Sequence, residues 1–462
     1  MRNRRAGFGG VGLVVMLAVA VRAAEPTVAV GVARIDVTPE LPIRLSGYQS
    51  RPAEATRVEA PLTARALAIG SDADGPVVIV TAEVIAVNEA ISEAVAAAVR
   101  AKYPAVTRER IAVCATHQHT GPAIAGTIPF MFSRDLPAEE TARIERYTAR
   151  LQEKLIAVAL AALADRRPAR LACGQGKAEF AVNRRLIVDG KHAGYKATPG
   201  GPVDHALPVL RAVDAGGGVR AVLVNYACHC TTLKGGDNYV HPDWAGEAAK
   251  RIEGSHAGAV ALVAIGCGAD SDPQPRGLLA VATNGGTVAE EVARVMAGEM
   301  RAVGRVTHAA FRRIELPLGR VVAREELEAR LKGKPQAVYA ATQFLRGLDA
   351  GKPWATVVPY PVQAWAFGGE FAMVFLGGEV VAEYALRLKR ELGVSRLWVN
   401  AYANHVPCYI PSRQVLKEGG YEADSAMDYY GWPTRLAEDT EDRIVRAVYE
   451  VLPANFGKGT PQ

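Results

Sequence analysis

The sequence has few cysteines, and it has no long apolar run after its first residues. Past Ala24 no apolar stretch approaches the roughly 20 residues that cross a membrane, so we expect a soluble mature protein without a transmembrane segment. Six cysteines in 462 residues are too sparse for a disulfide framework, even in an exported chain. They are Cys114, Cys173, Cys228, Cys230, Cys267 and Cys408.

The chain also lacks clusters of basic residues interleaved with aromatic ones, so nothing in it indicates a nucleic-acid partner. Its formal charge of +6 falls to +2 without residues 1–24, which hold four arginines and no acidic residue. A Gly-x-Ser-x-Gly segment is absent as well, which makes a serine hydrolase the weakest of the enzyme classes considered.

The first 24 residues have the pattern of a secretory signal peptide. Arg2, Arg4 and Arg5 precede an apolar run from Val11 to Val21, and small residues follow it. An uncleaved anchor is the competing interpretation, but the run is short for a membrane span. We therefore expect a secreted or periplasmic protein.

The pattern of the remaining chain predicts an α/β fold, with a mixed β-sheet core flanked by helices in a single large catalytic domain over residues 25–462. Two fused halves would fit the length as well. The expected strands are Val77–Thr81, Ile111–Ala115, Ala221–Tyr226, Ala259–Ile265 and Leu397–Asn400, with a hairpin formed by Val362–Phe367 and Phe371–Leu376. The expected helices are Glu89–Lys102, Ala138–Ala164, Thr287–Met300, Arg324–Leu348 with a break near Pro335, Val380–Leu392 and Arg435–Val451.

Two histidines lie at the end of one predicted strand. His117 and His119 follow the apolar run Ile111–Ala115 and precede a Gly-Pro turn. Side chains two residues apart in an extended segment leave the same face, so both imidazoles can converge on one ligand. A metal ion with an adjoining substrate contact suits this arrangement. Two solvated histidines in a polar loop are the alternative.

Several segments occur in one order along the chain. They are Gly31-Val-Ala-Arg-Ile-Asp-Val-Thr-Pro39, Gly47-Tyr48, Thr116-His-Gln-His-Thr-Gly-Pro122, Asn225-Tyr-Ala-Cys-His229, Gly377-Gly-Glu379, and Asn404 through Tyr409-Ile-Pro-Ser412. Together they resemble the neutral or alkaline, non-lysosomal ceramidase family in its N-terminal catalytic domain. In that family a zinc-dependent site hydrolyses the amide of an N-acylated sphingoid base, with a zinc-activated water attacking the acyl carbonyl.

The resemblance implies four Zn²⁺ ligands: His117, His229, Glu379 and Tyr409. Nitrogen and oxygen ligands of this kind suit Zn²⁺, which lowers the pKa of a bound water to roughly 7. The residues themselves leave alternatives open. Glu379 is predicted to open a helix, where the helix dipole favours an acid without any metal. His405 is a rival to Tyr409, and a thiolate site on Cys228 and Cys230 is a further alternative to buried cysteine fillers.

The resemblance also implies residues that act on the substrate. His119 matches the family's substrate-binding histidine, and Arg184 matches an arginine that faces the scissile group and would stabilise a developing oxyanion. Arg185 could fill that role instead, and we expect whichever of the two arginines does not fill it to be a surface charge.

The segment Gly266-Cys-Gly-Ala-Asp-Ser-Asp-Pro273 departs from the family. Its alignment places Asp270 on the family aspartate and Asp272 where a serine of the site is expected, while Ser271 should face away. Either aspartate could be a general base, or substrate specificity could differ. A Pro-terminated turn without a role is the remaining interpretation. We also expect no β-rich C-terminal domain after Val451, which weakens the assignment of ceramide as the substrate.

The sequence therefore favours an exported zinc-dependent hydrolase of C–N amide bonds that acts on a small-molecule or lipid amide. The alternatives are a non-catalytic ligand-binding relative with the same fold, or a metallo-hydrolase of another amide or ester.

Overall fold

The structure, a computed structural model, describes residues 27–352, 354–369, 371–454 and 456. The predicted signal peptide at residues 1–24 lies outside the described residues. Within the described part of the chain, no helix combines the length and apolar character that a membrane crossing requires.

The larger of two main sheets has nine strands and is mixed. Eight of them lie in the order β11-β10-β9-β5-β1-β2-β3-β4, and β13 adds to β5. The pairs β3–β4 and β10–β11 are parallel, and the other neighbours are antiparallel. The strands are β1 (Thr27–Asp36), β2 (Thr63–Ile69), β3 (Val77–Ala82), β4 (Ile111–Ala115), β5 (Arg167–Lys177), β9 (Ala206–Asp214), β10 (Val219–Tyr226), β11 (Val260–Ile265) and β13 (Arg301–Val303).

The second main sheet has four strands, in the order β14-β15-β16-β18. Three short two-stranded sheets complete the β structure, and two of them carry site residues. The strands of the second sheet are β14 (His308–Pro317), β15 (Val357–Phe367), β16 (Phe371–Leu376) and β18 (Leu397–Asn400). The short pairs are β6 (Ala181–Asn183) with β12 (Ser271–Pro273), β7 (Arg185–Val188) with β8 (Lys191–Tyr195), and β17 (Glu379–Val380) with β19 (Tyr409–Ile410).

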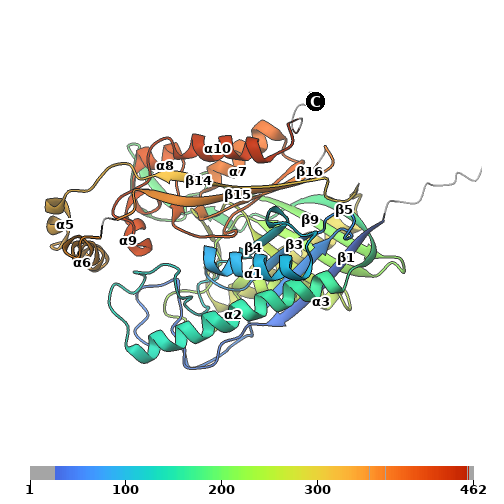
Figure 1. The fold of residues 1–462 in the computed structure, drawn as a ribbon, viewed down its shortest axis with the longest axis horizontal. Helices are drawn as coiled ribbons and strands as arrows, with labels where there is room; N and C mark the ends of the chain where they lie inside the picture. The colour runs from blue at the N-terminus through green and yellow to red at the C-terminus, as the bar shows by residue number, and fades with distance from the viewer. Residues whose placement is uncertain (1–26, 353, 370, 455, 457–462) are drawn as a thin grey trace, which may run out of the picture.

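Helices cover the outer faces of both main sheets (Figure 1). α1 to α4 belong to the side of the nine-stranded sheet, whereas α7 and α10 pack on the four-stranded sheet. The helices are α1 (Glu89–Lys102), α2 (Ala138–Ala164), α3 (Asp243–Ser255), α4 (Leu278–Ala297), α5 (Arg324–Arg330), α6 (Pro335–Asp349), α7 (Ala382–Leu392), α8 (Arg413–Glu418), α9 (Met427–Tyr430) and α10 (Thr440–Val451). A 3₁₀ turn, η1 (Arg108–Arg110), and a π-helical turn, η2 (Tyr421–Ser425), also form.

Strand β4 shows why its sequence is apolar at every position. Ile111 and Val113 belong to the core under the helices, whereas Ala112 and Cys114 belong to the core between the two sheets. Alternate side chains of one strand thus fill two different cores. Both faces of the strand are therefore covered, one by helices and the other by the second sheet.

The large sheet curves until its two end strands, β11 and β4, contact each other. The segment after β18 joins them, because Asn400 forms an isolated bridge with Gly266 and Ala403 forms one with Cys114. A backbone hydrogen bond supports this junction: the N–H of Ala401 donates to the carbonyl oxygen of Ile265 at 2.9 Å. The loops that follow β4 and β11 therefore meet the loop after β18 at one end of the molecule.

Several predicted elements are confirmed with the bounds given above: β4, β18, α1 and α2. The hairpin of β15 and β16 and the break before Pro335 are confirmed as well. The helix predicted from Thr287 in fact begins at Leu278. The helix contains Gly285, where a Cβ would lie 2.8 Å from Glu247 of α3. Glycine disfavours the helical conformation, but here it is required because the two helices pack closely.

Candidate metal centre and active site

His117 directly follows β4 and has a left-handed backbone, with φ at 57°. This conformation is uncommon for a residue other than glycine, and it turns the chain out of the strand. The His117 ring is buried and lies nearly parallel to the ring of Tyr402, with centroids 4.3 Å apart. Its Nδ1 lies 2.6 Å from the carbonyl oxygen of Ile85, which fixes the direction of Nε2.

His229 follows β10 and is fully buried. A parallel bridge between Gln118 and Cys230 holds its loop against the loop of His117. The Nδ1 atom of His229 lies 2.8 Å from the carbonyl oxygen of Gly268, in the loop after β11. Two neighbouring loops of the curved sheet thus bring together histidines that are far apart in the sequence.

Glu379 completes this group from the second half of the chain. Its Oε2 lies 3.0 Å from Nε2 of His117 and 3.2 Å from Nε2 of His229. The prediction that Glu379 opens a helix is wrong: it lies in β17, which pairs in parallel with β19 and places Glu379 opposite Tyr409, while α7 begins at Ala382. Backbone pairing therefore positions this carboxylate, so a position at a helix start does not explain it.

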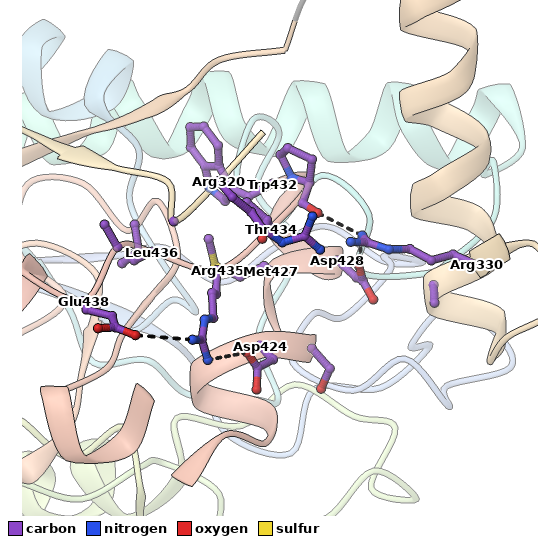
Figure 2. Close-up of a pocket in the computed structure, with 15 residues that line it drawn as sticks. Arg320, Arg330, Asp424, Met427, Asp428, Trp432, Thr434, Arg435, Leu436 and Glu438 are labelled. Carbon is purple, nitrogen blue, oxygen red and sulfur yellow. Dashed lines mark hydrogen bonds and ion pairs between the residues drawn. The ribbon is translucent and has the colours of Figure 1, made fainter. Parts of the chain in front are cut away.

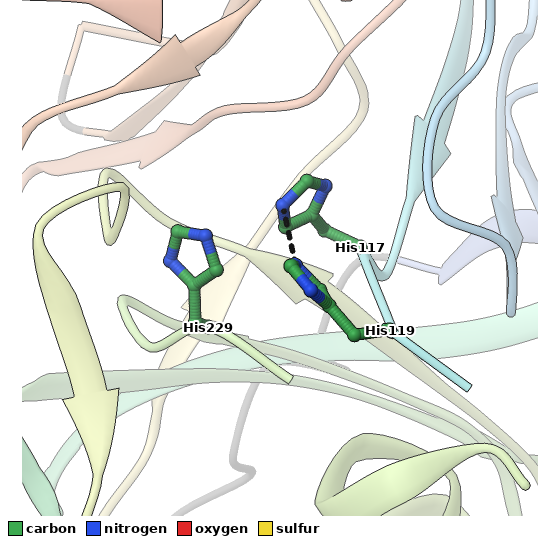
Figure 3. Close-up of side chains that lie close together, drawn as sticks. All are labelled: His117, His119 and His229. Atoms are coloured by element: carbon green, nitrogen blue, oxygen red, sulfur yellow. Dashed lines mark hydrogen bonds between the residues drawn. The ribbon is translucent and has the colours of Figure 1, made fainter. Parts of the chain in front are cut away.

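The donor and acceptor pattern of this cluster fits a cation. A carbonyl oxygen only accepts hydrogen bonds, so Nδ1 of His117, of His119 and of His229 must donate, to Ile85, Gly47 and Gly268 respectively. This leaves each Nε2 with a lone pair when the ring is neutral. Figure 3 shows the three imidazoles close together, with ligand atoms within 4.8 Å of one another.

The lone pairs and a carboxylate oxygen therefore face one another in a buried space. Nε2 of His229 and Oε2 of Glu379 have no hydrogen-bond partner among the described residues. Converging buried acceptors repel unless a cation or a proton lies among them. This chemistry matches a metal site of nitrogen and oxygen ligands, held by outer carbonyl groups in the way that metal-binding histidines commonly are.

The electrostatics of the cluster favour the forms that bind a metal. Burial, together with the neighbouring histidines, holds the pKa of His119 well below its usual value, and burial also lowers the pKa of His229. Burial alone would raise the pKa of Glu379, but His117 and His229 outweigh it and hold that pKa well below the usual range. The lowered pKa values favour neutral rings at His119 and His229 and an ionised carboxylate at Glu379.

Tyr409 and Arg184 lie next to the cluster and contact each other. The Arg184 guanidinium donates to the Tyr409 hydroxyl at 3.1 Å, to Asp272 at 3.2 Å and to Glu422 at 3.0 Å. Each guanidinium nitrogen thus has a different partner. Burial raises the pKa of the Tyr409 phenol well above its usual value, and Arg184 acts in the opposite direction.

Arg185 contacts a different set of residues from Arg184. Its guanidinium lies 2.5 Å from Glu422 and 3.0 Å from Glu418, and its side chain is 3% exposed. The expectation that the second arginine is a surface charge is therefore wrong. Of the two arginines, Arg184 is the one that reaches Tyr409 and Asp272.

The two aspartates of the departing segment have different surroundings. Asp272 lies on β12 and accepts from Arg184 and from the Thr231 hydroxyl, both at 3.2 Å. Burial would raise its pKa, but Arg184, His229 and Arg276 together lower it. Asp270 accepts instead from the N–H of Ala382 at 2.9 Å and from the Asn183 amide at 3.0 Å, and burial raises its pKa to about 7.

Ser271 lies between these aspartates and is fully buried. Its hydroxyl has no hydrogen-bond partner among the described residues, and its carbonyl accepts from the N–H of His229 at 2.9 Å. Within this segment Ala269 and Asp270 form a turn, and Ser271–Pro273 form a short strand paired with β6. Asp272, and not Ser271, is the residue whose side chain contacts Arg184.

His119 forms the more open side of the cluster. Its Nε2 lies 3.2 Å from Nε2 of His117, and its ring packs edge-on to Tyr48. A Cβ at Gly47, where φ is +87°, would lie 2.6 Å from the His119 ring. A glycine is therefore required beside this imidazole. Arg276 donates to the Tyr48 hydroxyl at 3.0 Å and borders the same side.

The rival ligands lie elsewhere or are unsuited. The charged neighbours of His405 are Glu89 and Arg313, on α1 and β14, and His405 does not belong to the histidine cluster. Cys228 and Cys230 are buried free thiols, and burial raises the pKa of each well above its usual value. Thiolates are disfavoured there, which agrees with the interpretation of these cysteines as buried fillers.

Comparison with known proteins agrees with this geometry. The family described as neutral/alkaline non-lysosomal ceramidase, N-terminal, matches residues 28–287, more than half of the chain. The chain belongs to this family.

Two solved ceramidase structures share the fold. Neutral ceramidase from Pseudomonas aeruginosa aligns with a TM-score of 0.71 at 20% identity, over 94% of this chain and 75% of that chain. A ceramidase complexed with C2 aligns with a TM-score of 0.70 at 19% identity, over 94% of this chain and 77% of that chain. No curated protein matches this chain by sequence. The α/β class and the mixed sheets are thus those of the ceramidase family.

This ceramidase-family chain has two buried site neighbours that sequence reasoning missed. Tyr430 donates a short hydrogen bond to Oε1 of Glu379, and Glu422 binds both Arg184 and Arg185. Neither residue stands in a distinctive local pattern: both lie in the short turns η2 and α9, which carry no periodic signal.

A cavity of about 620 Å³ lies away from the histidines, none of which lines it. Figure 2 shows it beside α9, lined by Arg330, Asp424, Asp428, Trp432 and Arg435 among others. A second cavity shares Asp424 and Ser425 with it and includes Tyr421, whose ring centroid is 5.2 Å from that of Tyr409. Tyr409, which pairs with Glu379, thus connects this second cavity to the buried histidine cluster.

Proposed function

We propose that this chain is an exported zinc-dependent hydrolase of the C–N amide bond of N-acylated amines, ceramidase-like in its chemistry, with residues 25–462 as the catalytic unit. The observation that carries the proposal is the convergence of two Nε2 lone pairs, from His117 and His229, on the Oε2 atom of Glu379. Family membership supports the choice of an amide as the bond that is cleaved.

In this proposal His117, His229, Glu379 and Tyr409 hold the Zn²⁺ ion. The neutral state of His229 and the ionised state of Glu379 are the forms that such binding needs. Arg184 favours the phenolate of Tyr409, because a cation that donates to the phenol oxygen stabilises its charged form. When bound, Zn²⁺ polarises the acyl carbonyl and lowers the pKa of a water to roughly 7.

The remaining predicted residues act on the substrate. His119 lies on the open side of the cluster, where its Nε2 lone pair can accept a hydrogen bond from the substrate. Asp272 is the candidate general base, since its lowered pKa keeps it ionised at neutral pH and it lies beside Arg184. Asp270 is instead engaged by two N–H donors, so we assign it a positioning role.

Metal analysis of the purified protein tests the site directly. The wild-type protein should contain about one zinc per chain, and His117→Ala and His229→Ala should each lose it. His405→Ala is the matched control, because this histidine lies outside the cluster and should leave the zinc content unchanged. Equal zinc in all four proteins would refute the site.

A panel of N-acyl amides and simple esters tests the activity. We expect amide turnover that a chelator abolishes and added zinc restores. Retained zinc without any turnover would indicate a non-catalytic relative that binds ligands, whereas turnover confined to esters would change the substrate class. Export is tested separately, by the N-terminal sequence of the protein recovered from the periplasm or medium, which should begin near residue 25.

A further inference from the structure

A cavity of about 580 Å³ adjoins the metal centre on the side of Tyr195 and Tyr421. The Tyr195 ring lies over the Arg184 guanidinium, with the ring centroid 5.4 Å from Cζ. The Tyr421 ring packs edge-on to the ring of Tyr409. Both walls thus touch residues of the proposed site, and the volume falls within the roughly 300–1,000 Å³ of typical ligand sites.

The lining of this cavity is aromatic and polar. It contains three tyrosines, and no aliphatic side chain larger than alanine. Tyr195 is 55% exposed, so a large part of its ring is free of protein contacts. The lining residues are His192, Ala193, Gly194, Tyr195, Lys334, Gln336, Gly420, Tyr421, Asp424, Ser425 and Tyr429.

Hydrogen-bonding groups line the cavity together with the tyrosines. Lys334 and Gln336, at the start of α6, provide an ammonium group and an amide, while Asp424 and Ser425 of η2 provide a carboxylate and a hydroxyl. Figure 1 shows α5 and α6 at one end of the molecule, next to α9. Donors, acceptors and aromatic rings thus surround one space.

The polar path continues beyond this cavity. Asp424 and Ser425 also line the larger cavity of Figure 2, where Trp432 adds another ring. Arg435 donates from Nη1 to the Leu416 carbonyl at 3.1 Å, and its ion pairs are long, 3.6 Å to Asp424 and 3.9 Å to Glu438. Ion pairs of that length leave the remaining guanidinium donors available to a ligand. The two cavities together give room for more than the reacting amide.

A long alkyl chain does not suit this surface. Burying a methylene group is favourable only when it leaves water for apolar surroundings. Here it would cover an ammonium group, a carboxylate and an amide and displace the water that hydrates them, a cost that outweighs the gain from the methylene group. Hydroxyl groups would instead replace the lost water contacts, and a saturated ring can lie on tyrosine faces.

We infer that this cavity, called here the tyrosine cavity, binds a hydroxyl-rich group attached to the amide, such as the ring of an N-acylated amino sugar or the sugar of a glycosylated N-acyl lipid. The inference rests on the proposed amide hydrolysis and narrows its substrates. It places the polar part of the substrate between Tyr195 and α6, and it assigns substrate selection to residues away from the metal.

A matched pair of substrates tests the inference. N-hexanoyl-glucosamine and N-hexanoyl-cyclohexylamine share the acyl group and a six-membered ring, and they differ in hydroxyl groups. We expect kcat/KM to favour the glucosamine amide at least tenfold, because polar groups of the site stay unpaired with the other. Hexanoyl amides of sphingosine and of glucosyl-sphingosine distinguish the free amino sugar from the glycolipid. Equal kcat/KM for glucosamine and cyclohexylamine amides would overturn the inference.

Variants of the α6 wall give the second measurement. Lys334→Ala combined with Gln336→Ala should raise KM for the glucosamine amide about tenfold and reduce its preference over the cyclohexyl amide. Lys332→Ala, two residues earlier and not in the cavity lining, is the matched control and should keep the wild-type preference. An unchanged KM in the double variant would also overturn the inference.

Calorimetry separates this inference from the proposed activity. Suppose that no amide is hydrolysed, but that N-hexanoyl-glucosamine binds the wild-type protein and binds the double variant more weakly. The inference about the tyrosine cavity would then stand, and the proposed function would be refuted. Absence of binding would refute the cavity. If amides are hydrolysed without a sugar preference, the proposed function stands and the inference falls.

Discussion

Tyr430 makes the two carboxylate oxygens of Glu379 different from each other. Its hydroxyl donates to Oε1, while Oε2 faces the two imidazoles. A carboxylate can rotate, so a fixed donor on one oxygen sets where the other one points. Tyr430 is itself 6% exposed and held in α9, which makes it a rigid support for a metal ligand.

Removal of this hydroxyl should weaken metal binding without removing a ligand. We expect Tyr430→Phe to raise the zinc dissociation constant 10- to 100-fold, as loss of a ligand's hydrogen-bond partner generally does. Competition with a chromophoric chelator measures this, and the spectrum of the cobalt-substituted protein reports a changed ligand field. Tyr429→Phe, whose hydroxyl bonds Gln49 instead, is the control. An unaltered affinity in Tyr430→Phe would exclude the positioning role.

Asp272 stands where the resemblance to the family predicts a serine, and its role can be tested by charge alone. Asp272→Asn keeps the shape and an oxygen for Arg184 but removes the base. If Asp272 is the general base, kcat should fall 10²- to 10⁴-fold with a small change in KM. Steady-state kinetics on the preferred amide measure it. Asp272→Ser, the family residue, should show the same loss, and nearly full activity in both variants would contradict the assignment.

At the scale of single residues, the sequence predicted the candidate metal ligands better than the residues that hold those ligands in place. The spacing of His117 and His119, and the strand before His229, were sufficient to bring these side chains to notice. Tyr430 and Glu422 were not predicted because they lie in short irregular turns. No hydrophobic periodicity there indicates which side chains point into the protein. The burial of Arg185 was missed for the same reason, since its partner Glu422 lies far away in the sequence.

The element that best explains the placement of the carboxylate is the short parallel pair of β17 and β19. It sets Glu379 beside Tyr409, and α7 begins only after it. Two-residue strands have no detectable period, so the sequence Gly-Glu before an amphipathic stretch was interpreted as a helix start. Long periodic elements such as α2, and fully apolar strands such as β4, were predicted with their bounds because burial dictates each position.

Asp270 connects β12 to the start of α7, and this contact depends on pH. The folded-state pKa of Asp270 is about 7, whereas an unfolded aspartate titrates near 3.9. The group therefore contributes stability that is fully present below about pH 4 and is lost as the pH rises through about 7. The protonated carboxyl is the form that suits its buried site.

Asp270→Asn removes this titration. The unfolding free energy of the wild type, taken relative to that of Asp270→Asn, should therefore fall as the pH rises from about 4 to 8, by an amount on the order of a few kcal/mol. Denaturant unfolding of the metal-free proteins at several pH values measures it. Asp189→Asn, on the exposed β7–β8 turn, is the control. A difference that is constant with pH would show that burial does not govern this carboxyl.

Across the whole molecule, the proposed metal ligands join parts of the chain that fold as different layers. His117 and His229 follow strands of the large sheet, whereas Glu379 follows the second sheet and Tyr409 lies beyond it. The curved sheet and the segment 400–404 bring these loops to one end. Such closure depends on contacts between distant segments, which is why the second sheet and the closed edge could not be predicted from local patterns.

A cation at this junction should therefore stabilise the whole fold and not only one loop. Binding to the folded state alone adds about 2.7 kcal/mol at a ligand concentration 100 times the dissociation constant. We expect zinc to raise the Tm of the metal-free protein by several degrees, and a chelator to reverse the rise. Calorimetry at fixed pH measures both. In His117→Ala combined with His229→Ala the rise should vanish, because two of the proposed ligands are gone, while His405→Ala should retain it. A rise of the same size in the double variant would show that zinc stabilises the protein from another site.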